Sequence, residues 1–572
     1  MSRVQRYLPA LSGTILENSN FFDLYPFDGG GFFVTRSILG TLDDEQIAAR
    51  IMKEDALRDY GALPALDYCR FERWSTIEKS CWINRMYFIV PLARTAKRRG
   101  DLHLASQVKE MILHFARTYP GPRTKEEICT LEREVVTARD RDYNRKGSSF
   151  DAPVSYQWFD FQVASRIVNI FHAIYFIREF PVFSGDDWML LDEMLFHHAR
   201  LICWSEEDFT ALAPGNHQAL RGMALLLAAG CFKGMPGTEN WAPVAEKICE
   251  YHILHDFLPD GMSRDLSPSY HFFECWIARD ILLLADREGF RLSEEARARL
   301  RLAFMLCRTL QQPDGRSTVI SDGYALPLSG FLDSLPEKGA VPPRCVLSSS
   351  GLCFYREKEI FLLLDCSPLL NSPSHYHGGK MAPTLFFRGR PFLTDSGCCN
   401  YDDPEFAEYY KLSRAHSSLL VDGAGDSVLE GRYAWLHAPV CSVGTWRNGT
   451  VECSMRSSAP GWETVQWMRR TEISGSSVIF FDAVRAGRAA EMSFIFNLHP
   501  DVTVEKRSDA FILRNHDVCV KASFSVEPEI ADALGYEKFA RCESRQLICR
   551  IKGAGCRHQA AFRLLSDGDG GF

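Results

Sequence analysis

The spacing of apolar residues changes once along this chain, from a helical to a strand period, and that change limits the domains it can form. The segment 161–177 carries one apolar stripe at helical spacing. The stripe comprises Val163, Ile167, Ile170, Phe171 and Ile174. Similar stripes recur at 104–115, 188–203, 220–227, 277–284 and 296–310. Helix after helix with no strand pattern between them predicts an all-α layer, in a toroid or a large bundle.

Past residue 340 the apolar runs are short, rich in β-branched and aromatic residues, and bounded by turn residues. They include 359–364, 385–393 and 478–482. Asn448-Gly449 stands between two such runs and predicts a tight hairpin. The C-terminal part is therefore expected to be an antiparallel β-sandwich.

The sequence thus predicts an α+β multidomain protein, with an α domain in residues 1–335 and a β-sandwich domain in residues 336–572. The boundary falls within 326–343, a stretch with Pro and Gly where helical spacing ends. A length of 572 residues exceeds what one hydrophobic core usually organises, in agreement with more than one domain.

The net charge of -8 argues against a general nucleic-acid or membrane-surface binder, which normally carries a large basic excess. An anionic partner would have to meet a local basic region. We expect no nucleic-acid or membrane partner, and a homo-oligomer is possible.

Cysteine usage and the first residues bear on location. The nineteen cysteines include no C-x-x-C pair, and an odd number suits reduced thiols. Residues 1–9 lack an apolar signal core, and no apolar run reaches membrane-spanning length. We expect a cytoplasmic protein, or a periplasmic or secreted one if the natural chain carries an export signal ahead of this sequence.

Asn216 and His217 follow Pro214-Gly215 and precede an apolar helix. They can be read as an N-cap and a first-turn residue without further function. As functional groups, they would donate hydrogen bonds to a substrate carboxylate at a helix N-terminus, where the dipole favours negative charge.

Tyr270 lies in the polar segment 260–271, at the entry to an aromatic helix. Such a tyrosine is most often a packing residue with a satisfied hydroxyl. As a catalyst it would transfer a proton, and a nearby Arg264 or His271 could lower the pKa of the phenol.

His375 and His377 place two imidazoles on one side of an extended segment, because side chains alternate along a strand. With Asp395 and His416, which flank later predicted strands, His377 could bind a divalent cation. Spacing alone is met equally well by surface histidines and unrelated turn residues.

In combination, these segments resemble the heparinase II/III superfamily of polysaccharide lyases, which also includes alginate and oligoalginate lyases. The resemblance rests on GNHQAL, DGMSRDLSPSYH, SHYHGGKMAPTLFFRGRPFLTDSG and RAHSSLLVDG, in that order, across roughly residues 60 to 500. It implies an incomplete (α/α) toroid followed by a large antiparallel β-sandwich, with the active site between them.

The resemblance also implies residue roles. Asn216 and His217 match the family's carboxylate-neutralising pair, Tyr270 its catalytic tyrosine, and His375 the histidine that partners that tyrosine. His377, Asp395 and His416 match the ligands of one divalent metal with a mainly structural role: zinc, with manganese or calcium as alternatives. No organic cofactor is expected.

Two positions depart from the family pattern. Gly378-Gly379-Lys380 follows His377, where relatives often carry an acidic residue two positions after this histidine, and Asp265 stands where glutamate is common. The Gly379 change leaves the hydrogen bonding around the metal ligands open.

The implied reaction is β-elimination from a uronic-acid polysaccharide, giving a 4,5-unsaturated uronate. Glycosaminoglycans (heparan sulfate, chondroitin sulfate or hyaluronan) are the first expected substrates and alginate the second. Guanidinium groups bind planar anions, and the candidates for substrate contacts are Arg166, Arg221, Arg264 and Arg414.

Two other functions remain open. One is a glycoside hydrolase on an α/α toroid, with Asp260 and Asp265 as the carboxylate pair. The other is a polysaccharide-binding protein that has lost its chemistry.

Overall fold

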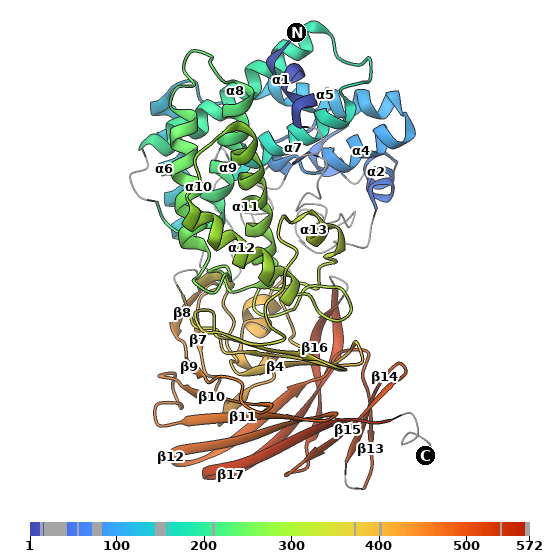
Figure 1. Cartoon of the computed structure of the whole chain (residues 1–572), viewed down its shortest axis with the longest axis vertical. Coiled ribbons are helices and arrows are strands. Elements are labelled where there is room, and N and C mark those ends of the chain that lie inside the picture. Colours follow the sequence, from blue (N-terminus) through green and yellow to red (C-terminus); the bar gives the residue numbers. More distant parts are fainter. Residues whose placement is uncertain are drawn as a thin grey trace.

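The computed structural model describes residues 1–11, 15–16, 43–53, 57–70, 83–142, 156–158, 161–208, 212–370, 373–399, 403–508, 510–537 and 540–566. Helices occupy the first part of the chain and strands the second (Figure 1). Among the described residues, the last α-helix ends at Ser334 and the first strand begins at Arg344, on either side of the predicted boundary.

The helices pack around one another at one end of the molecule (Figure 1). They are α1 (Arg3–Tyr7), α2 (Asp44–Met52), α4 (Ile89–Arg99), α5 (Leu102–Thr118), α6 (Lys125–Asp142), α7 (Phe161–Ile177), α8 (Gly185–Asp208), α9 (Asn216–Cys231), α10 (Trp241–Asp256), α11 (Pro268–Glu288), α12 (Glu294–Thr309) and α13 (Ser329–Ser334). Each predicted apolar stripe falls in one of them, although the stripe at 296–310 runs one residue past the end of α12, and the stripe at 161–177 coincides with α7. In the described ranges, every helix is too short or too polar to cross a lipid bilayer.

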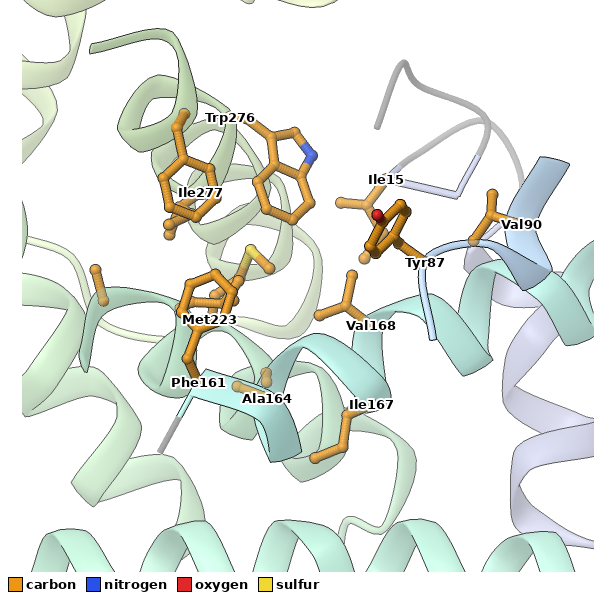
Figure 2. Packing of buried hydrophobic residues seen from close by; sticks show 14 of the residues in the cluster. Ile15, Tyr87, Val90, Phe161, Ala164, Ile167, Val168, Met223, Trp276 and Ile277 are labelled. Carbon is orange, nitrogen blue, oxygen red and sulfur yellow. The ribbon is translucent and has the colours of Figure 1, made fainter. Parts of the chain in front are cut away.

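Helices α7, α9 and α11 form the centre of the helical domain. Nearly every residue of α7 is buried, which explains its uniformly apolar sequence. Figure 2 shows Phe161 of α7, Met223 of α9 and Trp276 of α11 meeting in this core. The first turns of α9 and α11 carry the predicted catalytic residues, so this core positions them.

The strands form two larger antiparallel sheets and one small one. They are β1 (Arg344–Leu347), β2 (Leu352–Glu357), β3 (Ile360–Asp365), β4 (Ala382–Phe387), β5 (Arg390–Leu393), β6 (Leu419–Val421), β7 (Val428–Glu430), β8 (Ala434–His437), β9 (Val440–Val443), β10 (Thr450–Arg456), β11 (Gln466–Ser474), β12 (Ser477–Asn497), β13 (Thr503–Lys506), β14 (Phe511–Asn515), β15 (Val518–Phe524), β16 (Glu529–Glu537) and β17 (Ala540–Leu564). Within the described part of the chain, β1 to β5 form a five-stranded sheet in sequence order. A ten-stranded sheet runs β13-β14-β15-β17-β12-β11-β10-β9, with β16 on β17 and β6 on β12, while β7 pairs with β8.

The five-stranded sheet lies between the helices and the larger sheet (Figure 1). Phe361 and Leu363 of β3 pack into the core of the helical domain, whereas Leu362 and Leu364 pack against the ten-stranded sheet. Strand β3 is therefore buried on both faces, which explains its unbroken apolar sequence. In contrast, β10 and β11 alternate buried and exposed residues because one face of their sheet meets solvent.

Two hairpins follow the turn chemistry of their sequence. Arg388 and Gly389, between β4 and β5, both have positive φ, as do Asn448 and Gly449 between β9 and β10. Positive φ at both central residues is the geometry that Asn-Gly and similar pairs favour in two-residue hairpins. The predicted hairpin at Asn448-Gly449 is confirmed.

Candidate active site

Tyr270 and His375 meet at the junction of the two domains. Tyr270 is the third residue of α11, which begins at Pro268, a residue whose fixed φ suits the first helical turn. His375 ends a short 3-10 turn between β3 and β4. Their ring centres are 3.7 Å apart, and Tyr270 is buried. The phenol and the imidazole are therefore close enough to act on one substrate atom.

Asp322 holds both histidines of the H-x-H segment. One carboxylate oxygen accepts from Nδ1 of His375 at 2.9 Å, and the other accepts from Nε2 of His377 at 2.7 Å. Burial opposes ionisation, yet Lys411 and the two histidines hold the pKa of this carboxyl well below its ordinary value. With Nδ1–H of His375 bonded to Asp322, the lone pair of the neutral ring is on Nε2, which lies 4.0 Å from Asp265 Oδ2.

Asp322 also ties this assembly to α11. Ser267, the residue before the helix, donates its hydroxyl to the backbone carbonyl of Asp322 at 2.9 Å. The predicted catalytic residues of the two domains are thus connected through one buried aspartate.

Asn216 is buried at the first position of α9, and its Nδ2 donates to Asp265 Oδ2 at 3.1 Å. The same Asp265 oxygen lies 4.0 Å from His375 Nε2. An amide nitrogen carries two hydrogens, so the bond to Asp265 fixes the orientation of the amide and leaves a second hydrogen for a ligand. Asn216 therefore lies beside the Tyr270 and His375 pair.

His217 is exposed and its ring packs 4.8 Å from that of Phe161. Phe161 in turn lies under the guanidinium of Arg85 at 4.5 Å. This tilted ring contact with Phe161 restricts the imidazole while leaving it accessible, as expected of a residue that meets a substrate anion.

His377, Asp395 and His416 are buried together on the sandwich side. His416 Nδ1 lies 2.8 Å from Asp395 Oδ2, and the ring centres of His377 and His416 are 5.5 Å apart. Nε2 of His416 donates to the carbonyl of Tyr410 at 2.9 Å. His377 Nδ1 is buried with no hydrogen-bond partner among the described residues. A ligating histidine normally directs its second nitrogen at a carboxylate or carbonyl, and both imidazoles do so here.

The structure explains the departure at Gly379. Its φ is +79°, and a Cβ atom at this position would lie 2.7 Å from Cβ of His416. Asp426 accepts from the backbone nitrogens of Gly379 and Lys380, each at 2.8 Å. Asp426, from the loop before β7, therefore holds the backbone of this turn next to His416.

The placement of two arginines argues against their expected role in substrate binding. Arg166 is fully buried, its three nitrogens are bonded to His198, Asn84 and Gln157, and burial lowers its pKa to about 9. Arg221 is buried in ion pairs with Glu206 at 2.8 Å and Glu132 at 3.1 Å. Both guanidiniums serve the helical core.

Arg264 and Arg414 are more accessible. Arg264 is half-buried and donates to the carbonyl of His255, whereas Arg414 is exposed over the ring of Tyr409. Their role in substrate binding stays a prediction.

The carboxylate pair of the hydrolase alternative is not arranged as that chemistry requires. Asp260 accepts from the backbone nitrogens of Ser349 and Ser350 and from the hydroxyl of Ser350, so it anchors the start of the sandwich domain. Asp265 binds Asn216. This arrangement argues against a hydrolase that uses the pair.

His271, which the sequence suggested as a cation near the Tyr270 phenol, has other partners in the structure. It lies in a buried group with Cys275 and Cys307. Its Nδ1 accepts from the backbone nitrogen of Ser263, so Nε2 carries the hydrogen and faces the carbonyl of Ala303 at 3.1 Å. This ring has no lone pair left for a metal. The cysteines in the described ranges are all free thiols, in agreement with the expectation of reduced cysteines.

Sequence reasoning missed Asp322, Lys411, Asp426 and Glu274. Asp322-Gly323 has the composition of an ordinary turn, so nothing local marked Asp322 as a partner of two histidines more than fifty residues away. Lys411 is fully buried above the rings of Phe406, Tyr433 and Trp435, which is rare for a lysine.

Two models of known protein families match this chain. The one described as Heparinase II/III N-terminus matches residues 66–335, and the one described as Heparinase II/III-like, C-terminal, matches residues 341–554. Together they span most of the chain.

Solved structures share the fold over nearly the whole chain. A structure described as heparinase III has a TM-score of 0.70 at 12% identity, covering 98% of this chain and 89% of that one. A heparan sulfate lyase mutant from Pedobacter heparinus has a TM-score of 0.63 at 14% identity, covering 98% and 87%. The predicted helical domain followed by an antiparallel β domain is confirmed.

A curated heparin-sulfate lyase from Pedobacter heparinus is 22% identical over 255 residues. The match covers 38% of this chain and 38% of that protein.

Proposed function

This chain belongs to the heparinase II/III family, and on that premise we propose that it is a polysaccharide lyase that cleaves uronic-acid-containing glycosaminoglycans by β-elimination. The observation that carries the proposal is the contact of Tyr270 with His375 beside Asn216, three groups contributed by both domains. Alginate is the alternative substrate.

The substrate carboxylate binds against Asn216 and His217, which stabilise the negative charge that develops when C5 loses its proton. The free N–H of Asn216 and the accessible ring of His217 suit this role. Neutralising the carboxylate makes the C5 proton more acidic. Removal of this proton is the difficult step of the reaction.

Tyr270 or His375 takes the C5 proton, and Tyr270 donates a proton to the departing glycosidic oxygen. The C4–O bond breaks and a C4=C5 double bond forms, which gives an unsaturated uronate at the new non-reducing end. Asp322 supports this step because it keeps Nδ1 of His375 protonated and the Nε2 lone pair directed at the substrate.

We also propose one divalent metal ion bound by His377, Asp395 and His416. The unpartnered Nδ1 of His377 and the outward bonds of both imidazoles support it. Two nitrogens and one carboxylate suit zinc, with manganese or calcium as alternatives. When bound, the ion would join the H-x-H segment to the loop at His416 and so stabilise the sandwich side.

The decisive experiment follows ultraviolet absorbance during incubation with heparan sulfate, chondroitin sulfate, hyaluronan and alginate, alongside a reducing-sugar assay. A rising unsaturated-uronate signal supports the lyase and identifies its substrate. New reducing ends without that chromophore would mean hydrolysis. Replacing Asp260 with Asn sharpens the choice, because a hydrolase using Asp260 would lose activity and the proposed lyase would keep it.

Elemental analysis of the purified protein tests the metal. We expect about one equivalent of a divalent ion in the wild type and its loss in His377→Ala. His437→Ala should keep the ion, because His437 lies on β8 and hydrogen-bonds to the Ser458 hydroxyl. A wild type without metal would contradict the assignment.

A further inference from the structure

A buried carboxyl pair adjoins Asn216 on the helical side of the site. Glu274 is one helical turn after Tyr270 in α11, so both side chains lie on the same face of the helix. Asp265 lies in the loop that leads into α11. Glu274 hydrogen-bonds to Asp265, and both residues are buried. The pair adjoins two proposed catalytic groups, since Asp265 contacts Asn216 and lies near His375.

The surroundings of Glu274 favour its neutral form. Burial raises the pKa of Glu274 well above its ordinary value, and the nearby charges of Asp265 and Asp256 raise it further. Arg264 acts in the opposite direction and is outweighed. Two carboxylates in contact inside a protein repel each other strongly, so one of them keeps its proton.

Two other titratable groups, Asp256 and His375, lie near the pair and have partners of their own. Asp256 of α10 accepts from the backbone nitrogen of Gly215 at 3.0 Å and pairs with His252 at 2.7 Å. His375 faces Asp265 from the sandwich side at 4.0 Å. The other carboxylate oxygen of Glu274, Oε2, is buried without a hydrogen-bond partner in the described part of the chain. Nothing among these contacts would compensate a second negative charge on Glu274.

We propose that Glu274 is a positioning residue for the lyase reaction: protonated Glu274 donates to Asp265, Asp265 holds the Asn216 amide toward the substrate carboxylate, and loss of the Glu274 proton sets the alkaline limit of activity. The inference rests on the proposed function. It assigns the effect to substrate binding, because the group controlled is the carboxylate-neutralising amide and not the proton-transfer pair.

The physical consequence of deprotonation is specific. An ionised Glu274 would repel Asp265, release the Asn216 amide and place an additional buried charge near the substrate carboxylate. Like charges oppose each other strongly where water is excluded. KM should therefore rise with pH before kcat falls.

The test replaces Glu274 with Gln, whose amide donates to Asp265 at every pH. We expect kcat/KM at the wild-type optimum within about three-fold of wild type, and an alkaline limb displaced upward by about one pH unit or more. Glu274→Ala removes the donor, and we expect KM to rise about ten-fold with a smaller change in kcat. Glu288→Gln, at the far end of α11 where Glu288 accepts from Tyr7, is the control and should keep the wild-type pH profile.

Difference infrared spectra give a readout that does not need turnover. The wild type minus Glu274→Gln spectrum should contain a protonated-carboxyl C=O band at neutral pH. If Glu274→Gln does not fold, titration of the wild-type band decides: a band present at neutral pH and lost in alkaline solution supports the proposal, and its absence at neutral pH overturns it.

The outcomes distinguish a failure of the role of Glu274 from a failure of the proposed lyase function. An active wild type in which Glu274→Gln leaves the alkaline limb unchanged overturns the role of Glu274 and leaves the lyase proposal intact. A wild type inactive on every uronate polysaccharide overturns the lyase proposal, while the infrared spectra still report on the shared proton.

Discussion

The helical and sandwich sides of the site hold their functional residues in different ways. On the helical side, Asn216 and Tyr270 stand on the first turns of α9 and α11, and the groups behind them are carboxyls that share a proton. On the sandwich side, His377 and His416 lie in or next to loops, and each is paired with an aspartate. One side is fixed by helix backbone and the other by hydrogen bonds to buried carboxylates.

This difference separates two kinds of sensitivity. A helix holds its first turn through backbone hydrogen bonds, so a side-chain change there removes chemistry and leaves the geometry in place. A loop histidine fixed by a buried carboxylate loses its orientation when that partner is removed. Changes on the helical side should therefore affect rate, and changes on the sandwich side should affect metal content and stability.

The largest effect is expected from Tyr270→Phe on the helical side. The phenol is removed while the ring still packs against His375, so we expect kcat to fall by about 10²–10⁴-fold with thermal stability unchanged. Tyr251→Phe on α10, where the ring stacks on His255, is the matched control. Activity of Tyr270→Phe close to wild type would remove this residue from the mechanism.

Asp322→Asn tests the link between the two sides. An amide cannot accept from both histidines as a carboxylate does, so we expect kcat/KM to fall by about 10–100-fold and bound metal to decrease. Steady-state kinetics and elemental analysis on the same preparation check both. If metal content falls and the rate does not, Asp322 acts only on the sandwich side and the comparison becomes sharper.

Gly379→Ala tests the sandwich side alone. Both Gly379 and Gly389 have φ near +80°, but a Cβ at Gly379 meets His416 whereas a Cβ at Gly389 has nothing within 4 Å. Gly379→Ala should therefore destabilise the fold by about 1–3 kcal/mol more than Gly389→Ala. Denaturant unfolding of the two variants measures the difference, and equal losses would mean that His416 moves aside freely.

The smallest effect concerns an ion pair that joins the domains away from the site. Glu537 accepts from His499 at 3.1 Å and from Arg316 at 3.0 Å. Although burial opposes it, these partners lower the pKa of Glu537 from 4.5 to about 2. A depressed carboxyl pKa stabilises the fold at pH values above the ordinary pKa of 4.5. This stabilisation is lost as the pH falls from 4.5 toward 2.

Glu537→Gln should therefore reduce stability by about 1–2 kcal/mol at neutral pH and by less in acid, with unchanged kinetics. Thermal melts at several pH values check this. A loss that is the same in acid would show that the pair contributes through packing alone.

The sequence predicted the regular parts of this molecule well. Helix α7 coincides with the segment chosen from its apolar stripe, and Asn448-Gly449 forms the predicted turn, because both features depend on neighbouring residues. The order of the motifs also predicted that Asn216, Tyr270 and His375 lie close together.

Local sequence patterns could not predict contacts between residues that are far apart in the chain. Asp322 and Asp426 each sit in a turn sequence, and only the fold brings them to the H-x-H segment. Arg166 was misread for the same reason, since a buried arginine with three acceptors looks like a surface arginine in the sequence. Glu274 was hidden within an apolar helix whose face had no assigned neighbour.

Because Asp322 is bonded to both domains, it limits how the site can open to admit a long polymer. Its backbone is bonded to Ser267 beside α11, while its carboxylate binds two imidazoles of the other domain. Separating the domains at this point would break the hydrogen bonds between this carboxylate and the two imidazoles. We therefore expect the two domains to stay joined at Asp322 when a substrate binds.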